Sequence, residues 1–374
     1  MKNIYLPGSS YISYDERAVI IEFENPHLVL SSSFLNGGLR QDLSYCFNYS
    51  EIYGKSDERC EMRAPTNEGH LCSIARELNL DPASATGLST AAKMKYVQIK
   101  TEKHPDFSIT AVVTAGIDVS GNRVGDPTYW HEREGVPVPH EAGTINVIVL
   151  SDVSLTGGAI TRALSVTAEA KTAALQEVLA PSAFSSGLAT GSGTDGFIIA
   201  GRLKGKIEIT NAGTHCKFGE YLGRLVKQTV IDALVAENGF RSYARGDLLK
   251  RTVRFGIDRD SLLGTFKKVG SRYCGDPDLF SQGLALLIND EKIILMVTLY
   301  GHLIDLLDWE LADASEVIIA AGQIISSLDR AVNKAPAFHK FSDAGRGQLK
   351  VELVNALTDA LARQIAAIID KGND

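Results

Sequence analysis

Three side chains of the sequence could cooperate in acid–base chemistry: Lys171, Asp195 and His215. Lys171 falls within an apolar stripe of a predicted helix, where a lysine either extends its amine to solvent or is buried, paired and able to lose basicity. Asp195 ends a loop of small residues that lets a ligand approach the backbone. His215 opens a second predicted helix, where a neutral imidazole could act as a base. These residues predict a polar, glycine-lined pocket.

Each candidate also has a purely structural interpretation. Lysine stems often cover apolar surface, and Gly-Thr-Asp-Gly at 193–196 is ordinary turn chemistry. Thr214 could be the N-cap that explains the segment around His215. Glu220, one turn later, could pair with His215 or be solvated. The residues alone therefore leave both interpretations open and name no substrate.

Several other site chemistries are not expected. The stretch ATGSGTDGFIIA (189–200) resembles a phosphate loop, but it leaves a helix and enters a strand, the reverse of the order that places phosphate at a helix N-terminus. The sequence has no HExxH motif, no CxxC pair and no GxSxG elbow. We therefore expect neither a nucleotide nor a metal site.

The composition is that of a folded protein: 44 % of the 374 residues are apolar and 22 % are charged, which is ordinary globular usage. A net charge of −7 argues against nucleic-acid binding. Five scattered cysteines suit a reducing compartment, and the N-terminus lacks a signal-peptide pattern, so we expect a cytoplasmic protein. The apolar stretch 293–307 contains His302 and Asp305 and is too short to span a membrane.

The element pattern changes near residue 240. Before it, short β-favouring runs are predicted at 18–23, 27–33, 43–49, 96–101, 108–117, 144–151, 196–201 and 206–210, with helices at about 157–179 and 215–237. The Pro- and Gly-rich segment 120–143 is expected to be a loop that covers a site. After it, helices are predicted at 276–288, 291–308, 312–332 and 348–371. We expect an α+β domain over 1–240, with a mixed or largely antiparallel sheet packed by long helices, and a helical domain over 241–374.

Several blocks resemble the adenosylcobinamide amidohydrolase (CbiZ) family. They are LSSSFLNGG (30–38), Asn48, GLSTAAKMKYV (87–97), VTAGIDVSG (113–121), GTINVIVLSD (143–152), TAEAKTAALQEVLAP (167–181), ATGSGTDGFII (189–199) and AGTHCKFGEYLG (212–223). The blocks occur in order over roughly 27–237. Ser192 and Cys216 stand where the family's blocks have threonine.

The resemblance implies hydrolysis of the amide that joins aminopropanol to the corrin ring of adenosylcobinamide, giving adenosylcobyric acid and 1-amino-2-propanol. The corrinoid would be the substrate, with no further cofactor or metal. The candidate catalytic residues are Lys171, Asp195, His215, Glu169, Thr194 and Glu220. The candidate substrate-binding residues are Ser32, Asn36, Gly37, Gly38, Asn48, Thr144, Asn146, Gly191, Gly193 and Thr214. Glu169 lies opposite the stripe that carries Lys171.

Two mechanisms and two other functions stay open. A water activated by Asp195 or His215 could attack the amide, with Lys171 stabilising the oxyanion and protonating the amine. A covalent route through Thr194 or one of the serines 31–33 is the alternative. The domain could instead bind corrinoid without cleaving it, as a trafficking or sensing protein, or act on another amide. The C-terminal helices, such as 291–308, could form a homodimer interface or complete the core.

Overall fold

The structure is a computed structural model that describes residues 2–6, 10–53, 62–117, 120–127, 143–239, 248–269, 273, 275–328 and 345–373. The chain forms two compact units, Met1–Phe240 and Arg241–Asp374. The predicted boundary near residue 240 and most of the predicted loop 120–143 lie outside the described residues. No helix in the described ranges is long and apolar enough to cross a membrane.

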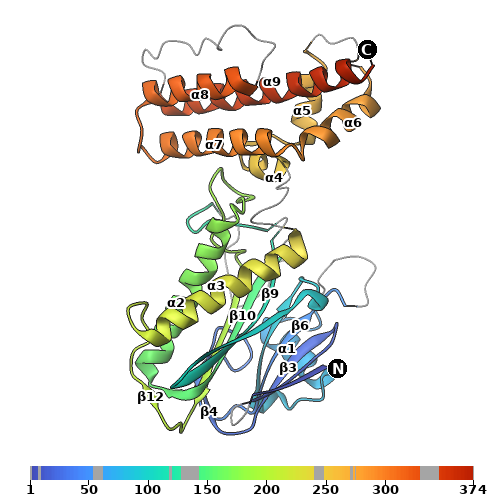
Figure 1. Ribbon diagram of the computed structural model, residues 1–374. Coiled ribbons are helices and arrows are strands. Elements are labelled where there is room, and N and C mark those ends of the chain that lie inside the picture. The colour runs from blue at the N-terminus through green and yellow to red at the C-terminus, as the bar shows by residue number, and fades with distance from the viewer. Residues whose placement is uncertain are drawn as a thin grey trace. The chain divides into compact units, whose positions relative to one another are not determined.

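The first unit contains two sheets (Figure 1). The first sheet has the order β1-β2-β3-β6-β7 and is antiparallel except where β6 and β7 run parallel. Its strands are β1 (Lys2–Leu6), β2 (Ser10–Tyr14), β3 (Ala18–Phe23), β6 (Tyr45–Ser50) and β7 (Ala85–Thr90). Helix α1 (Asn67–Glu77) packs Leu71 and Ile74 with Phe47 and so covers one face of this sheet.

The second sheet has the order β5-β4-β11-β10-β9-β8, and β12 also pairs with β10. Its strands are β4 (His27–Ser31), β5 (Gly38–Arg40), β8 (Gln98–His104), β9 (Phe107–Gly116), β10 (Thr144–Leu155), β11 (Gly196–Arg202) and β12 (Glu208–Ile209). Strand β10 pairs parallel with β11 and β12, and the remaining neighbours are antiparallel. The sheet is therefore mixed.

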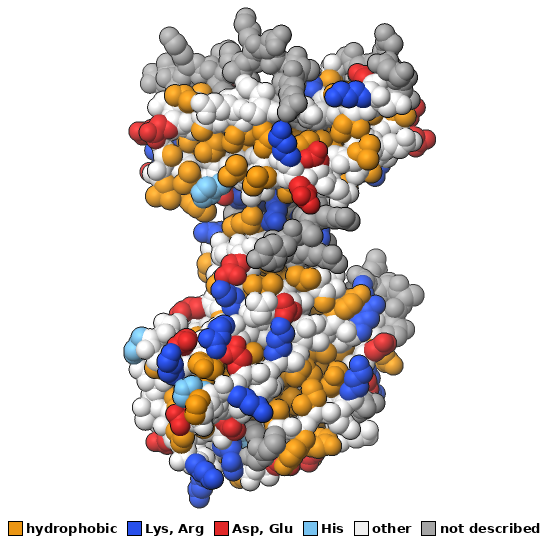
Figure 2. All heavy atoms as spheres, in the orientation of Figure 1, with side chains coloured by type: hydrophobic (Ala, Val, Ile, Leu, Met, Phe, Trp, Pro, Cys, Tyr) orange, Lys and Arg blue, Asp and Glu red, His pale blue; other side chains and the backbone are white. Residues whose placement is uncertain are grey.

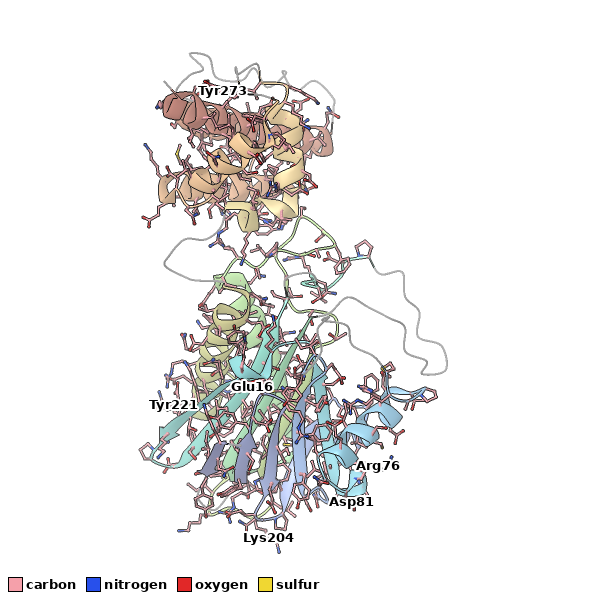
Figure 3. All side chains as sticks on the ribbon, turned by 90° about the vertical axis from the view of Figure 1, so that its right-hand side faces the viewer. Glu16, Arg76, Asp81, Lys204, Tyr221 and Tyr273 are labelled. Carbon is pink, nitrogen blue, oxygen red and sulfur yellow. The ribbon has the colours of Figure 1, made fainter. Side chains whose placement is uncertain are left out.

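Alternation along the buried strands separates two cores. Val147 and Val149 of β10 face helices α2 (Gly157–Glu177) and α3 (Lys217–Asn238), whereas Ile148 and Leu150 face the first sheet. The layers run α1, first sheet, second sheet, then α2 and α3, as the two views show (Figures 1 and 3). Short 3₁₀ turns lie between α1 and β7, at Pro82–Ser84, and between β7 and β8, at Met94–Tyr96.

The second unit is helical throughout its described residues. Its helices are α4 (Leu248–Thr252), α5 (Arg259–Phe266), α6 (Pro277–Leu287), α7 (Glu291–Asp308), α8 (Ala314–Leu328) and α9 (Arg346–Asn373), with a 3₁₀ turn at Val253–Phe255. They share one core, in which the Tyr300 hydroxyl donates to the Leu353 carbonyl at 2.9 Å. Apolar side chains also gather on the outer face of α7, where Leu295 is 61 % exposed (Figure 2).

The predicted fold class is confirmed: antiparallel-rich mixed sheets are packed by long helices, and helices follow. The helix predicted at 157–179 is α2, and the strand predicted at 18–23 is β3. Strands β1, β2 and β7 and helix α1 were not predicted. With the predicted strands β3 and β6, strands β1, β2 and β7 form a separate sheet, whereas the pattern indicated a single sheet.

Candidate active site

Helix α2 positions Lys171. Thr156 caps the helix by accepting a hydrogen bond from the Ala159 N–H at 3.2 Å, and the helix then packs its apolar stripe on the second sheet. Lys171 lies within that stripe and is only 7 % exposed. The amine is therefore held inside the protein instead of extending to solvent.

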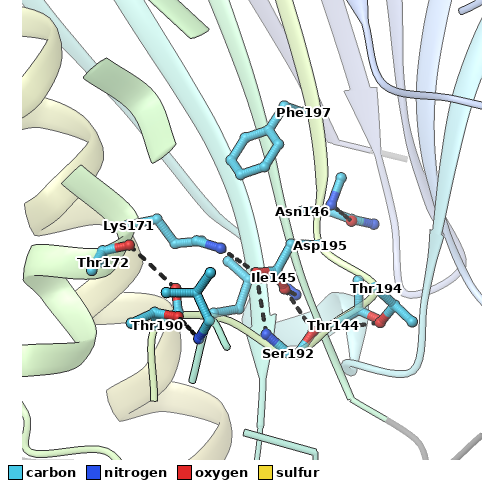
Figure 4. Close-up of polar contacts among 12 residues, drawn as sticks. Thr144, Ile145, Asn146, Lys171, Thr172, Thr190, Ser192, Thr194, Asp195 and Phe197 are labelled. Atoms are coloured by element: carbon cyan, nitrogen blue, oxygen red, sulfur yellow. Dashed lines mark hydrogen bonds and ion pairs between the residues drawn. The ribbon is translucent and has the colours of Figure 1, made fainter. Parts of the chain in front are cut away.

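Asp195, the residue before β11, is the partner of this amine. It forms an ion pair with Lys171 through Oδ2, and the same oxygen accepts the Ser192 N–H at 3.2 Å. Its Oδ1 accepts the Ile145 N–H at 3.0 Å and the Ser192 hydroxyl at 2.6 Å (Figure 4). A carboxylate offers about four lone-pair positions. All four are occupied, so in this arrangement Asp195 has no position left for a water that it would activate.

Glycine is required where the loop passes this ion pair. A Cβ built on Gly191 would lie 2.7 Å from Lys171 Nζ and would also overlap the Asp195 carboxylate. Gly193 has φ +74°, in the left-handed region that glycine tolerates. Asn122 pairs with Gly191 in an isolated antiparallel bridge, which joins this loop to the segment 120–127. The predicted roles of the two glycines as substrate contacts remain untested.

A set of hydroxyl groups continues outward from Asp195. Ser192 Oγ lies 3.4 Å from Thr194 Oγ1, which lies 2.8 Å from Thr144 Oγ1. The Thr194 hydroxyl donates to the Gly143 carbonyl at 2.9 Å. Thr144 is buried and Thr194 is exposed. Thr194 is therefore the member of this set that a substrate can reach.

Ser32, the residue after β4, lies next to β11. The Phe197 N–H donates to Ser32 Oγ at 2.9 Å, and the Ser32 N–H donates to the Phe197 carbonyl at 2.9 Å. Lys171 Nζ lies 5.4 Å from the centre of the Phe197 ring, a cation–π arrangement. The structure thus places Ser32 and Lys171 against the same residue, Phe197, and the role of Ser32 in substrate binding stays a prediction.

Asn48 and Asn146 are close to this site but buried beneath it. Each is 1 % exposed. Asn146 Oδ1 accepts the Gly196 N–H at 3.1 Å, and its Nδ2 donates to Asn48 Oδ1 at 2.8 Å and to the Ser89 carbonyl at 2.9 Å. Asn48 Nδ2 donates to Thr114 Oγ1 at 2.8 Å. These amides join the two sheets below the Asp195 loop and present no surface to a ligand.

Asn36, Gly37 and Gly38 form a turn. Asn36, at φ 50°, donates through Nδ2 to the carbonyls of Pro82 at 2.7 Å and Ala85 at 2.8 Å. A Cβ on Gly37 would overlap the Ser33 carbonyl, and Gly38 has φ +83°. The geometry of this turn accounts for all three residue types, so their predicted contact with substrate has no support of its own.

His215 lies at the opposite end of the second sheet from Asp195. Phe218, three residues after His215 in the first turn of α3, packs on Phe107 with ring centres 5.2 Å apart. Phe107 begins β9, whereas Gly116 at the end of β9 pairs with Thr144 beside Thr194. Nine residues of extended strand span roughly 30 Å. The prediction that His215 shares one pocket with Lys171 and Asp195 is therefore wrong.

Three further candidates lie away from the Lys171–Asp195 ion pair. Thr214 and Glu220 are with His215 at the start of α3, and Glu220 forms exposed ion pairs with Lys217 and Arg224. Glu169 is exposed on α2. Cys216, not Thr214, is the N-cap of α3. The structure does not bring these residues into the Asp195 cluster.

Sequence reasoning gave Ser192 no role of its own, although it lies in the loop that was singled out. Its hydroxyl and its N–H both bind Asp195. The signal was present in the spacing Ser192-x-x-Asp195, which suits a side chain that turns back on its own loop. Among the described residues, no group of three or more His, Cys, Asp or Glu side chains could hold a metal ion.

An exposed hydroxyl linked through a serine to a carboxylate–lysine pair is suited to acyl transfer. The model of the family described as adenosylcobinamide amidohydrolase matches residues 5–242, and the chain belongs to this family. The first unit carries the match; helices α4–α9 lie outside it.

Two further comparisons place the chain among known proteins. It is 29 % identical over 235 residues to an uncharacterized protein, MJ1613, of Methanocaldococcus jannaschii. The aligned region covers 60 % of this chain and 88 % of the relative. A crystal structure of the PH0078 protein from Pyrococcus horikoshii aligns over 63 % of this chain and 81 % of its own, with 13 % identity and a TM-score of 0.30. A likeness at that score carries no inference.

Proposed function

We propose that the protein hydrolyses the aminopropanol amide of adenosylcobinamide to adenosylcobyric acid and 1-amino-2-propanol, as a cytoplasmic step of cobamide salvage. Membership of the adenosylcobinamide amidohydrolase family supports the reaction class. The hydroxyl relay from Thr194 through Ser192 to Asp195 supports a site for it. The corrinoid is the substrate in this proposal, and no further cofactor is needed.

The observation that carries the mechanism is the contrast between Thr194 and Asp195. The Asp195 carboxylate is occupied by four donors, whereas the Thr194 hydroxyl is exposed. His215, the other predicted base, lies at the far end of the sheet. These placements favour the covalent route through Thr194 over direct attack by a water that Asp195 or His215 would activate.

In the first step, Thr194 Oγ1 forms a bond to the amide carbon as its proton moves to Ser192 Oγ, whose own proton moves to Asp195. The Thr194 hydrogen points to the Gly143 carbonyl at rest and turns toward Ser192 by rotation about the Cβ–Oγ1 bond. The carbon–nitrogen bond then breaks, and the proton returns along the relay to the departing amine. This releases 1-amino-2-propanol and leaves a threonyl ester of the corrin side arm.

In the second step, water attacks the ester carbon. Its proton passes to Thr194 Oγ1 as the carbon–oxygen bond breaks, which releases the carboxylic acid and restores the hydroxyl. The Lys171 ammonium lies beside the relay, where its positive charge can stabilise the negative charge that develops on the substrate oxygen. Asp195 passes the proton and also fixes the lysine.

The test is to incubate the protein with adenosylcobinamide in the presence of a chelator and to follow corrinoid and aminopropanol by mass spectrometry. Thr194→Val keeps the side-chain shape and removes the hydroxyl, and we expect it to lose activity on the order of 10³-fold or more. Thr161→Val is the matched control, since Thr161 is an exposed threonine whose hydroxyl donates to the Gly157 carbonyl of its own helix.

Each outcome separates the alternatives. An intact-mass increase on Thr194 during turnover supports the ester. Full activity of Thr194→Val would mean that water attacks directly. Corrinoid binding by the wild-type protein without cleavage would contradict the proposed reaction and favour a trafficking or sensing protein, and a requirement for added metal would contradict the proposal that no cofactor is needed.

A further inference from the structure

The helix-facing side of the second sheet carries an apolar row beside the Lys171–Asp195 ion pair. Leu30 of β4 lies opposite Ile199 of β11 on one side and opposite Leu39 of β5 on the other. Directly opposite residues point to the same face of a sheet. Ile199 belongs to the core under α2 and α3, and Leu30 and Phe197 pack against that core. Leu39 therefore lies on the same face.

This row becomes open toward the edge of the sheet. Strand β5 is the edge strand, and Leu39 is 50 % exposed, while Leu30 and Phe197 are half-buried. From β11 to β5 is two interstrand spacings, roughly 10 Å. We call Leu30, Leu39 and Phe197 the edge shelf. It is an apolar surface that α2 covers at one end and leaves open at the other.

Polar groups lie at the covered end and in the middle of the edge shelf. Alternation puts Asp195, Phe197 and Ile199 on one face of β11, and Lys171 Nζ lies over the Phe197 ring. Ser32, which is exposed, accepts the Phe197 N–H and keeps its own O–H free to donate. Arg40 points to the other face, where it bonds Asp42. The shelf itself thus carries no exposed charge.

We propose that the edge shelf binds the flat apolar face of a corrin macrocycle, so that its amide arm reaches Thr194 past Ser32. This inference rests on the proposed function. The occupant follows from three observations: contacts from Phe197 through Lys171 and Asp195 link the shelf to the hydroxyl relay, the shelf is wider than one side chain, and it is open at the sheet edge. A flat ring with polar arms fits this combination, because the ring covers Leu39 and an arm meets the exposed Ser32.

The shelf predicts an effect on binding that is separable from catalysis. Leu39→Ser removes exposed apolar area on an edge strand, and we expect it to weaken binding of both adenosylcobinamide and adenosylcobyric acid by about fivefold to tenfold. Adenosylcobyric acid has the ring but lacks the reacting amide, so its binding does not depend on hydrolysis. For turnover we expect a higher KM and an unchanged kcat.

Tyr5→Ser is the matched control. Tyr5 is 52 % exposed and lies on β1, the edge strand of the other sheet. Binding is measured by equilibrium dialysis of the coloured corrinoids, with the substrate tested in a Thr194→Val background. Phe197→Leu is the second variant, and we expect it to weaken binding while folding normally, because leucine fills most of the same space.

The outcomes distinguish this inference from the proposed function. Weaker corrinoid binding by Leu39→Ser but not Tyr5→Ser supports the shelf, even if the wild-type protein cleaves nothing. Hydrolysis with no effect of Leu39→Ser or Phe197→Leu on KM or on corrinoid binding overturns the shelf alone. Failure of the wild-type protein to bind either corrinoid overturns the shelf, as does a β5 edge that pairs with a second copy of the chain in solution.

Discussion

Lys171 and Asp195 form an ion pair in which both side chains are 9 % exposed, although one comes from α2 and the other from the loop before β11. Taking two charges out of water is costly, and a partner left alone inside the protein costs more than the pair does. The ion pair is therefore a point where stability and the proposed chemistry depend on the same contact.

The first prediction concerns this ion pair. Asp195→Asn leaves the Lys171 ammonium without its counter-charge, and we expect the free energy of unfolding to fall by about 3–5 kcal/mol. Adding Lys171→Met removes the unpaired charge and should restore part of that loss, but not the activity. Urea unfolding and turnover of the wild-type protein, Asp195→Asn and the double variant measure both effects.

Glu220→Gln is the control for this prediction. Its ion pairs with Lys217 and Arg224 are exposed to solvent, so breaking them is expected to leave the free energy of unfolding nearly unchanged. Equal stability of Asp195→Asn and the double variant would show that the buried ammonium is not the source of the loss. Wild-type turnover by Asp195→Asn would remove Asp195 from the relay.

The second prediction concerns the buried amides that join the sheets. The Gly196 N–H and the Ser89 carbonyl fix the orientation of Asn146, and Asn146 in turn fixes Asn48. In Asn146→Asp, an acceptor would face the Ser89 carbonyl and Asn48 Oδ1, where donors are needed. In Asn48→Asp, the new oxygen can instead accept from the Thr114 hydroxyl.

We therefore expect Asn146→Asp to destabilise the protein more than Asn48→Asp, although both introduce an acid at a site that is 1 % exposed. The difference should be on the order of 1–3 kcal/mol, the cost of leaving buried groups without partners. Paired urea titrations at one pH measure it. The same loss of stability in both variants would show that the orientation of the Asn146 and Asn48 side-chain amides does not set the size of the loss.

The sequence predicted local structure better than the arrangement of the strands in space. The strand at 18–23 and the helix at 291–308 follow from periodicity and caps, which act within a few residues, and both were predicted. The pairing of β4 with β11 joins residues about 170 positions apart. No local pattern states such a pairing, so the assignment of the strands to two sheets could not be predicted.

Because local patterns do not state long-range pairing, the sequence could identify site residues but not which of them lie together. Lys171 and Asp195 were found because a lysine in an apolar stripe and a carboxylate after small residues are unusual in themselves. His215 was grouped with them because its segment resembles a site. Which end of β10 each segment meets is decided by tertiary packing, and the ends of that twelve-residue strand are far apart.

The third prediction concerns pH and His27, at the start of β4. His27 is fully buried, stacks on Phe23 with ring centres 4.5 Å apart, and lies 2.6 Å from the Asn25 carbonyl through Nδ1. Burial lowers the pKa of His27 below its ordinary value of 6.5, and the nearby Arg202 lowers it further, against the opposing effect of the Asn25 carbonyl. The folded protein therefore holds this imidazole neutral.

The sign of the effect follows from proton binding. Between the lowered folded pKa and 6.5, the unfolded chain binds a proton at His27 that the folded chain does not, so stability falls as pH falls below about 6.5. The limiting slope for one group is about 1.4 kcal/mol per pH unit. We expect His27→Gln to have a smaller loss between pH 6.5 and 5.5 than the wild-type protein, whatever its stability at pH 7.5.

Urea midpoints at pH 7.5, 6.5 and 5.5, followed by far-ultraviolet circular dichroism at constant ionic strength, measure this slope. His302→Gln is the control, because His302 is exposed in the second unit and should leave the slope unchanged. A slope in His27→Gln equal to that of the wild-type protein would place the responsible group elsewhere. A slope that disappears would identify β4, the strand that ends at Ser31 beside the candidate site, as the acid-sensitive element of the second sheet.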